Sequence, residues 1–270
     1  MYNSMCLHIS FYYKEERINY LNVILNETSR YPFQVDIFIN TNVKEFDKAK
    51  LMNYTRGSLI IVHHDLKDEH GHYLTWKCRP IMKSLRDKYD IFMYIEDDIA
   101  VPLNAIEYWM KYKDTCIQNN CNLGFIRIEH ANGYQYCTDF DNDLYKQISR
   151  NYINLDSTRF IINDSNPYCA MWIYDRSEFI KWTESEFYDP ANIMKRKIKR
   201  GLEKLTREKS AYGLHPKGHG CKCFWYKHTI IPTEMNGLRL NPDCRIQHLA
   251  NNYIGTHMSQ FQFHKIIKHN

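Results

Sequence analysis

Short apolar runs alternate with segments of helical spacing through the first hundred residues of the chain. Each run has the length of a β-strand, and we expect four strands, at residues 5–12, 35–39, 59–62 and 91–95. Apolar side chains that recur every three or four positions predict helices at residues 18–29 and 74–89, the second interrupted or restarted at Pro80. The resulting β-α-β-β-α-β order predicts an α/β fold, with a mostly parallel sheet flanked by helices on both sides.

The pattern changes in the second part of the chain. A helix is expected at residues 105–113, and strands at residues 123–129 and 168–174. The polar stretch between these two strands is rich in Tyr and Asn, has poor periodicity and is expected to form loops. Residues 229–231 and 246–249 are expected to bring the tail back to the core. A length of 270 residues fits one domain built on such a sheet.

Polar side chains follow each of the four strands expected in the first part. Parallel sheets bind ligands at the carboxyl ends of their strands, so these polar ends should gather along one edge of the sheet. They are Tyr12-Tyr13, Asn40-Thr41-Asn42, His64-Asp65 and Glu96-Asp97-Asp98. Their coincidence predicts the rim of a single pocket.

The acidic triplet Glu96-Asp97-Asp98 follows a continuously apolar strand at residues 91–95, which we expect to be buried on both faces. Three adjacent negative charges repel one another unless a positive charge lies among them. A hard divalent cation, Mg²⁺ or Mn²⁺, provides that charge and completes its shell with water and phosphate oxygens. The alternative is a solvated acidic turn or a helix N-terminal cap. We favour the metal site, because an acidic turn rarely follows a buried strand so abruptly.

This strand and triplet resemble the core strand and DxD motif of the GT-A fold nucleotide-sugar-dependent glycosyltransferases, with Glu in place of the first Asp. The resemblance covers residues 5–100 well and the rest loosely. It implies one Rossmann-like GT-A catalytic domain over residues 1–270, with a nucleotide-sugar-binding half at about 1–100 and a loop-rich acceptor-binding half with its tail at about 101–270. It also implies a metal-dependent glycosyltransferase, which moves a sugar from a nucleotide-sugar donor, most commonly a UDP-sugar, to a hydroxyl of a glycan, protein or small molecule.

The resemblance also implies roles for the residues of the motif. Asp98 would bind Mn²⁺ or Mg²⁺ on the donor diphosphate, and Glu96 would face the ribose or a metal-bound water. Asp97 would contribute to either task, in catalysis or in donor binding. The nucleotide cradle would be formed by the ends of the first two strands, at Tyr12, Tyr13 and Asn40.

Two further segments resemble donor-binding parts of these enzymes. The helix before the triplet would contribute Thr75, Lys77 or Arg79 to the base or phosphates, and the alternative is an amphipathic helix with solvated cations. Many GT-A enzymes bring a C-terminal His onto the metal, and His248 is the candidate here. A neutral imidazole favours Mn²⁺ over Mg²⁺. The alternative for His248 is a hydrogen-bonded core residue.

The catalytic base is the least defined part of the site. An inverting enzyme needs a carboxylate to deprotonate the acceptor hydroxyl. Glu208 is the preferred candidate, ahead of Glu184, Glu186 and Asp189, which could equally cap a helix. A retaining mechanism needs no such base, and the sequence leaves the stereochemical course open.

Composition narrows the class of partner. The net charge of +5 suits a small anionic ligand, whereas a nucleic-acid binder usually shows a denser basic face. The basic run from Lys195 to Arg200 is expected to be a solvated helix face. With no visible signal peptide and no apolar run of ~18 residues, we expect no membrane span, reduced thiols and a cytoplasmic location. Asn, Ile and Lys are abundant, and all three are encoded by AT-rich codons. Such a composition suits a protein of a host-cell cytoplasm or of large DNA virus origin.

Other interpretations remain beside the glycosyltransferase. A non-catalytic GT-A-like module that binds glycan or nucleotide would have little need of three clustered carboxylates. A nucleotidyltransferase on a similar fold usually carries a Gly-rich first loop, and the segment at residues 11–14 has no Gly. A zinc site could be formed by His219, Cys221, Cys223 and His228. Their spacing is irregular and matches no standard zinc finger.

Overall fold

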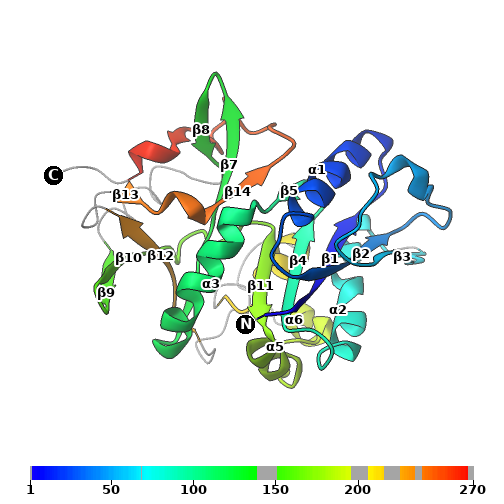
Figure 1. Ribbon diagram of the computed structural model, residues 1–270, viewed down its shortest axis with the longest axis horizontal. Coiled ribbons are helices and arrows are strands. Elements are labelled where there is room, and N and C mark those ends of the chain that lie inside the picture. The colour runs from blue at the N-terminus through cyan, green and yellow to red at the C-terminus, as the bar shows by residue number, and fades with distance from the viewer. Residues whose placement is uncertain are drawn as a thin grey trace. The chain divides into compact units, whose positions relative to one another are not determined.

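The structure is a computed structural model of the chain and describes residues 2–67, 69–138, 151–195, 206–215, 226–234 and 239–266 (Figure 1). The chain forms two compact units. The first unit combines Met1–Ile99 with Ala170–Gly213 and Gly218–Gly220. The second combines Ala100–Cys169 with Leu214–Lys217 and Cys221–Asn270. Each unit is described below by itself.

The first unit is built on a five-stranded sheet in the order β11-β4-β1-β2-β3. β1 to β4 are parallel to one another, and β11 lies antiparallel at the edge beside β4. The strands are β1 (Ser4–Phe11), β2 (Gln34–Thr41), β3 (Leu59–His63), β4 (Ile91–Glu96) and β11 (Met171–Asp175). Every residue of β4 is buried, as expected for a central strand covered on both faces. The α/β fold and its mostly parallel sheet are therefore confirmed.

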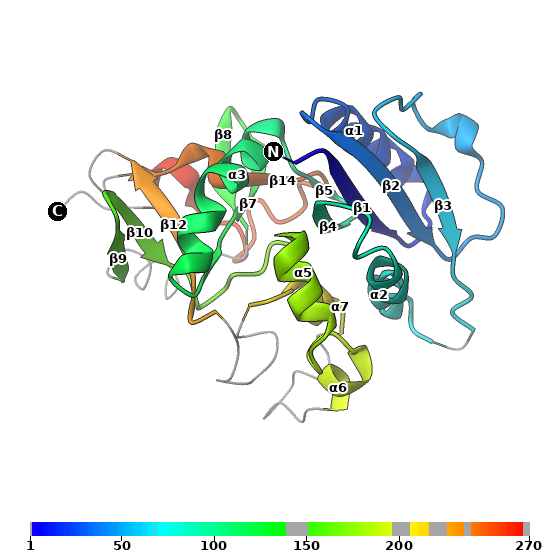
Figure 2. The same ribbon diagram turned by 60° about the horizontal axis from the view of Figure 1, so that its bottom comes forward.

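Helices cover both faces of this sheet. α1 (Ile18–Thr28) follows β1 and α2 (Leu74–Ser84) precedes β4, so right-handed crossovers in opposite directions place them on opposite faces (Figures 1 and 2). α2 packs against β1 and β2. Other helical segments among the described residues of the unit are η1 (Glu15–Arg17), η2 (Lys48–Lys50), η3 (Gly71–Tyr73), α5 (Arg176–Thr183), α6 (Pro190–Lys195) and α7 (Thr206–Ala211).

Pro80 lies inside α2, and the prediction that it would interrupt or restart the helix is wrong. Its missing N–H removes one backbone hydrogen bond, but α2 is held by its apolar face. Leu74, Trp76 and Met82 on this face are at most 4% exposed. The helix ends at Ser84, five residues before the predicted end, where the apolar spacing continues but the backbone turns.

The described residues of the second unit form two sheets and one long helix, α3 (Leu103–Gln118). One sheet has the order β13-β12-β10-β9, with β6 beside β12, and the other has the order β15-β8-β7-β14-β5. The strands of the first sheet are β6 (Cys121–Leu123), β9 (Tyr152–Leu155), β10 (Thr158–Ile162), β12 (His228–Glu234) and β13 (Arg239–Leu240). Those of the second are β5 (Ile99–Ala100), β7 (Ile126–Ala131), β8 (Tyr134–Cys137), β14 (Arg245–His248) and β15 (Phe261–Gln262). The described part of the unit also has the 3₁₀ turns η6 (Pro242–Cys244) and η7 (Phe263–Lys265).

The prediction that the stretch between residues 129 and 168 forms loops is wrong, because β8, β9 and β10 lie there. β7 and β8 form a hairpin around Asn132 and Gly133, whose φ angles of 51° and 77° suit the two-residue turn that matches strand twist. The single strand expected at 123–129 is two strands, divided at Gly124. A Cβ there would meet Thr229 Cγ2 at 2.7 Å and Ile231 Cγ1 at 2.9 Å, so the close approach of β12 requires glycine.

None of the helices in the described ranges is both long enough and apolar enough to cross a lipid bilayer.

Candidate ligand-binding site of the first unit

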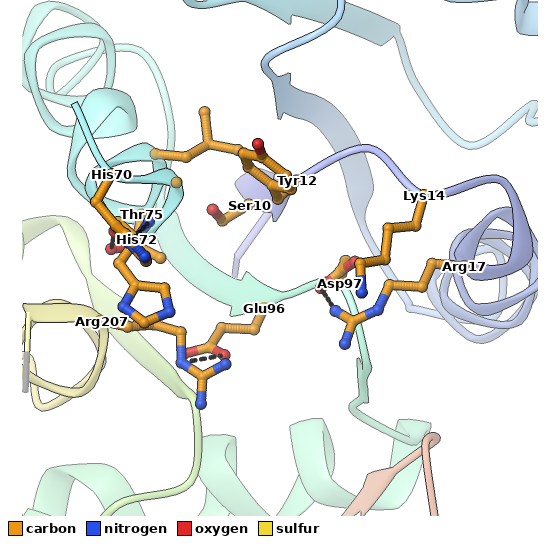
Figure 3. A pocket seen from close by; sticks show the side chains of 12 residues that line it. Ser10, Tyr12, Lys14, Arg17, His70, His72, Thr75, Glu96, Asp97 and Arg207 are labelled. Carbon is orange, nitrogen blue, oxygen red and sulfur yellow. Dashed lines mark hydrogen bonds and ion pairs between the residues drawn. The ribbon is translucent and has the colours of Figure 1, made fainter. Parts of the chain in front are cut away.

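A cavity of about 410 Å³ opens at the carboxyl ends of β1 and β4 (Figure 3). The sheet register aligns the polar positions of this edge, because Ser10 pairs with Asn40 on one side and with Glu96 on the other. All lining residues belong to the first unit. They are Ser10, Tyr12, Lys14, Arg17, His70, Gly71, His72, Leu74, Thr75, Glu96, Asp97 and Arg207. Four of the predicted site residues line this cavity, Tyr12, Thr75, Glu96 and Asp97.

The acidic triplet is buried at this edge. Glu96 is the last residue of β4, and Asp97 and Asp98 form the turn that follows. The three residues are only 5%, 4% and 6% exposed. Consecutive carboxylates at this depth need positive charge nearby, because burial without compensation is costly.

Two arginines provide that charge. Arg17 Nη1 lies 2.8 Å from Asp97 Oδ1 and 3.6 Å from Asp98 Oδ2, and Arg207 Nε lies 3.5 Å from Glu96 Oε2 (Figure 3). Neither arginine was singled out from the sequence. Arg17 had a usable signal, because it follows β1 by six residues and therefore lies at the same strand-end edge as the triplet. Arg207 had none, because only tertiary folding brings α7 to this edge.

The protonation of Asp97 is finely balanced. Burial and then the neighbouring Asp98 charge raise the pKa of Asp97 to about 7, although Arg17 acts in the opposite direction. Arg17 itself is charged, since the charges of Asp97 and Asp98 raise its pKa despite burial. Asp97 Oδ2 is buried and has no hydrogen-bond partner within the described chain. This oxygen is therefore available to a cation or to a proton.

The acidic turn fits a divalent cation only as part of a mixed shell. The described residues hold no group of three or more His, Cys, Asp or Glu side chains arranged around a metal position. Asp97 Oδ2 is nevertheless an unpartnered buried oxygen donor, and Asp98 is adjacent to it. Mg²⁺ is commonly held by one or two carboxylates and completes its octahedron with water and phosphate oxygens. Asp97 and Asp98 provide two carboxylates for such a shell.

Cations dominate the rim of the cavity. Lys14, Arg17 and Arg207 line it, and the Lys14 ammonium is exposed and makes no ion pair with any described carboxylate. His72 also lines the cavity, and burial, His70 and Arg207 all lower its pKa, so it is neutral at pH 7. Arg17 and Arg207 pair with the three carboxylates of the triplet, so Lys14 is the lining cation left for an anionic ligand.

Tyr12 and Tyr13 point to different surroundings. Tyr12 lines the cavity, is 47% exposed and packs against Gly71, where a Cβ would lie 2.7 Å from the tyrosine ring. Gly71 therefore admits the Tyr12 ring to the rim. Tyr13 is not a lining residue: its ring packs edge-on against Phe11 and Phe46, and its hydroxyl donates to Glu15.

Asn40 is buried in a hydrogen-bond relay and does not line the cavity. Its Nδ2 lies 3.0 Å from His8 Nδ1, and its Oδ1 accepts from His64 Nε2 at 2.9 Å. Burial lowers the pKa of His8 to about 3 and that of His64 to about 4, so both rings are neutral. Asn40 therefore fixes the ends of β1, β2 and β3 relative to one another.

The three residues predicted on α2 have separate environments. Thr75 lines the cavity and donates its hydroxyl proton to His72 O at 2.9 Å. Lys77 Nζ pairs with Glu69 Oε2 at 2.6 Å, away from the lining residues. Arg79 is 1% exposed and donates to Tyr188 O at 2.6 Å, with its guanidinium 4.3 Å from the Trp76 ring centroid. Of the three, only Thr75 meets the cavity.

Glu208 and His248 lie outside the cavity lining. Glu208 follows Arg207 on α7, and its Oε2 is buried with no hydrogen-bond partner in the described chain. His248 belongs to the second unit, where its Nδ1 lies 2.6 Å from Oε1 of Glu129, a fully buried residue. His248 also stacks on Tyr253. This environment is that of a hydrogen-bonded core histidine, the alternative role considered above.

Two features that the sequence singled out lie outside the described residues. They are the basic run at residues 196–200 and the three positions His219, Cys221 and Cys223 of the possible zinc site.

Comparison with known proteins adds no assignment, because no protein-family model and no curated protein matches the chain. Its function is therefore argued from the chemistry of the cavity.

Proposed function

We propose that the first unit binds the diphosphate of a nucleotide sugar together with Mn²⁺ or Mg²⁺, and that the protein transfers the sugar to a hydroxyl acceptor. One observation carries the proposal. A single cavity at the carboxyl ends of parallel strands combines buried carboxylates, Glu96 and Asp97, with three cations at its rim. Parallel sheets commonly bind nucleotides at this edge.

The charge pattern favours a phosphate ligand with a metal. Lys14 is the cation free to bind a phosphate directly, because Arg17 and Arg207 are engaged with the triplet. A diphosphate next to Glu96 and Asp97 would be repelled unless another positive charge entered with it. A cation held by Asp97 and Asp98 would supply that charge, and it would stabilise the charge that grows on the leaving diphosphate. Tyr12 offers an exposed ring on which a base or sugar can pack.

Glu208 remains our candidate for the proton acceptor. Its Oε2 is buried without a partner in the described chain, and its neighbour Arg207 lines the cavity. A carboxylate in such a place can accept a proton from a hydroxyl that reaches it. A UDP-sugar remains the proposed donor because it is the commonest type.

The ion pairs of Arg17 and Arg207 favour a second candidate function. If these two arginines are the only counter-charges that the triplet needs, the unit binds a nucleotide without a metal and without transfer. Arg17 Nη1 lies 2.8 Å from Asp97 Oδ1, a full hydrogen-bond contact that a metal would have to share.

A thermal-shift screen of nucleotide sugars, each with Mn²⁺ and with EDTA, separates the two functions. Binding to the folded state raises stability by about 2.7 kcal/mol when the ligand is at 100 times its Kd. Glycosyl transfer predicts a Mn²⁺-dependent shift and slow release of the nucleoside diphosphate. An equal shift in EDTA, with no release in the presence of candidate acceptors, would favour the metal-free binding module. No shift with any nucleotide sugar would refute both.

A further inference from the structure

The second unit has a cavity of its own, of about 390 Å³. The β7–β8 turn, β13, η6 and η7 contribute its walls, so all of it belongs to this unit. The residues that carry the argument are Arg245, Arg239, Tyr134, Gln135, Phe263 and His264. The volume lies within the range of about 300–1,000 Å³ that is usual for small-molecule sites.

Arg245 is held in place by neutral partners. Its Nη1 donates to Gln135 Oε1 at 2.5 Å, and its Nε donates to Pro242 O. Its guanidinium carbon lies 5.3 Å from the Phe263 ring centroid. Nη2 has no hydrogen-bond partner within the described chain. The orientation of the guanidinium is therefore fixed, while one edge remains able to donate.

Arg245 and Arg239 share the cavity with one carboxylate, Glu234, which lies opposite Arg239 in the β12–β13 pair. Neither Arg245 nor Arg239 forms an ion pair with a carboxylate in the described part of the chain. Elsewhere in this unit, an exposed carboxylate does pair with a buried cation, as Asp114 does with Lys113 at 2.6 Å. Two arginines and one glutamate line the cavity, so one positive charge is in excess. The rigid guanidinium of Arg245 is preorganised for an anionic group, and its planar donors match a carboxylate.

Aromatic side chains also line the cavity. Tyr134 is 50% exposed, and its ring centroid lies 6.4 Å from that of His264 at an interplanar angle of 30°. An exposed tyrosine next to the turn at Asn132 and Gly133 offers a flat apolar surface with a hydroxyl at its edge. The apolar face of a pyranose ring packs on such a surface, and its hydroxyls can be bonded by Gln135 and His264.

We propose that this cavity binds an acidic saccharide, a sugar that carries a carboxylate. Arg245 takes the carboxylate, with Arg239 as the second cation, and Tyr134 takes the ring face. Different segments provide the two parts of this site. The η6–β14 segment provides the cation, and the β7–β8 turn provides the aromatic ring. The proposal does not rest on glycosyl transfer, because no residue of the first unit takes part.

The test is a binding titration of the full chain with three probes: a glucuronic-acid-containing disaccharide, its neutral glucose analogue, and inorganic phosphate. Saturable binding of the uronate, at least about tenfold tighter than the other two, is the expected result. Equal binding of the neutral sugar overturns the role of Arg245. Equal binding of phosphate overturns the saccharide and leaves a plain anion site.

Variants assign the binding to this cavity. Arg245→Gln and Tyr134→Ala should each weaken uronate binding about tenfold. Arg159→Gln is the matched control, because Arg159 also stacks on a tyrosine of this unit, 4.5 Å from the Tyr152 ring centroid, and lies outside the cavity. If Arg245→Gln fails to fold, Arg239→Gln at an exposed position replaces it. Wild-type affinity in Tyr134→Ala, or an equal loss in Arg159→Gln, overturns the proposal. Asp97→Asn should bind the uronate normally, which separates this result from any failure of nucleotide binding in the first unit.

Discussion

Arg17 Nη1 donates to Asp97 Oδ1 at 2.8 Å, so the acidic turn after β4 is met by a cation from the segment after β1. The two residues are 80 positions apart and come together because β1 and β4 are neighbours in the sheet. Arg17 therefore competes for the oxygens that a divalent cation would use. The competition makes Arg17 a probe of the metal proposal.

Arg17→Gln should strengthen the binding of Mn²⁺ alone, because Asp97 and Asp98 lose their internal counter-charge. The same variant should weaken metal-free binding of UDP, because the cavity loses one of its three cations. We expect about tenfold in each direction, from a charge–charge contact at a partly buried site. Electron paramagnetic resonance of free Mn²⁺ and calorimetry with UDP measure the two effects. Arg30→Gln is the control, since Arg30 pairs with Glu27 on the surface. Weaker Mn²⁺ binding in Arg17→Gln would contradict metal binding at Asp97 and Asp98.

Asp98→Asn should abolish Mn²⁺-dependent transfer and leave the fold intact, because Asn keeps the shape and loses the charge. Loss of one such electrostatic contact costs roughly 3 kcal/mol, or about a hundredfold in rate. Release of UDP from a UDP-sugar at saturating donor measures the rate, and circular dichroism checks the fold. Asp87→Asn, at a side chain that is 77% exposed, should behave as the wild type. Unchanged turnover in Asp98→Asn would remove Asp98 from the mechanism.

His248→Ala tests the tail. The imidazole is bonded to a fully buried Glu129, whose oxygens also accept from the Tyr253 and Ile254 N–H groups. Removal of one partner of a buried hydrogen bond leaves the other without a partner and typically costs about 1–3 kcal/mol, and we expect a loss of this order. If His248 only supports the second unit, stability falls equally with and without Mn²⁺, and UDP affinity is unchanged. If His248 is a metal ligand, Mn²⁺-dependent UDP affinity falls and metal-free affinity does not.

Arg79→Met should destabilise the first unit without changing nucleotide affinity, because Arg79 is a core residue. Its guanidinium lies between the rings of Trp76 and Trp182, at 4.3 and 4.8 Å from their centroids. Met approximates its length and loses the cation–π contacts and the bond to Tyr188 O, so we expect about 2–3 kcal/mol. Urea denaturation measures the loss. Lys77→Met on the same helix should change stability by less than about 1 kcal/mol. If Arg79→Met weakens UDP affinity and Lys77→Met does not, Arg79 is part of the donor site after all.

The strands of the first unit could be predicted because each is a local signal. A buried strand is an unbroken apolar run, and residues 91–95 show it without any knowledge of their neighbours. The antiparallel addition of β11 could not be predicted, since its partner in β4 is about 80 residues away and pairing leaves no local mark. The β7–β8 hairpin does have a local mark, the Asn132-Gly133 pair, although the surrounding tyrosines and asparagines obscure the alternation of its strands.

The candidate site was predictable to the same extent. Strand ends identified Tyr12, Glu96 and Asp97, because a parallel sheet places its carboxyl ends at one edge. Arg79 and Lys77 could not be told apart by sequence, since both are cations on one helix. Only packing shows that Arg79 is enclosed by aromatic rings and that Lys77 pairs with Glu69. Arg207 comes from a segment more than 100 residues after the triplet, and its pairing with Glu96 follows from tertiary structure alone.

Asp97 should make the stability of the metal-free protein depend on pH. Its pKa of about 7 in the folded state lies above the ordinary value of 3.8, so the folded chain holds a proton that the unfolded chain has lost. Between these values the folded state binds more protons, and the free energy of unfolding must fall as pH rises. The stabilising contribution is complete below about pH 4 and is lost above about pH 7.

Asp97→Asn removes this titration. Measured in EDTA from pH 4 to pH 8, the variant should gain stability relative to the wild type as pH rises, by at most about 4 kcal/mol at 1.36 kcal/mol per pKa unit. The asparagine oxygen can still accept from Arg17, and the slope is lost because the amide does not titrate. Asp87→Asn should run parallel to the wild type, because its exposed carboxyl contributes no comparable burial. Parallel curves for Asp97→Asn and the wild type would show that Asp97 is ionised throughout. In that case Arg17 would stabilise the ionised form of Asp97, and a cation that binds Oδ2 would not have to displace a proton.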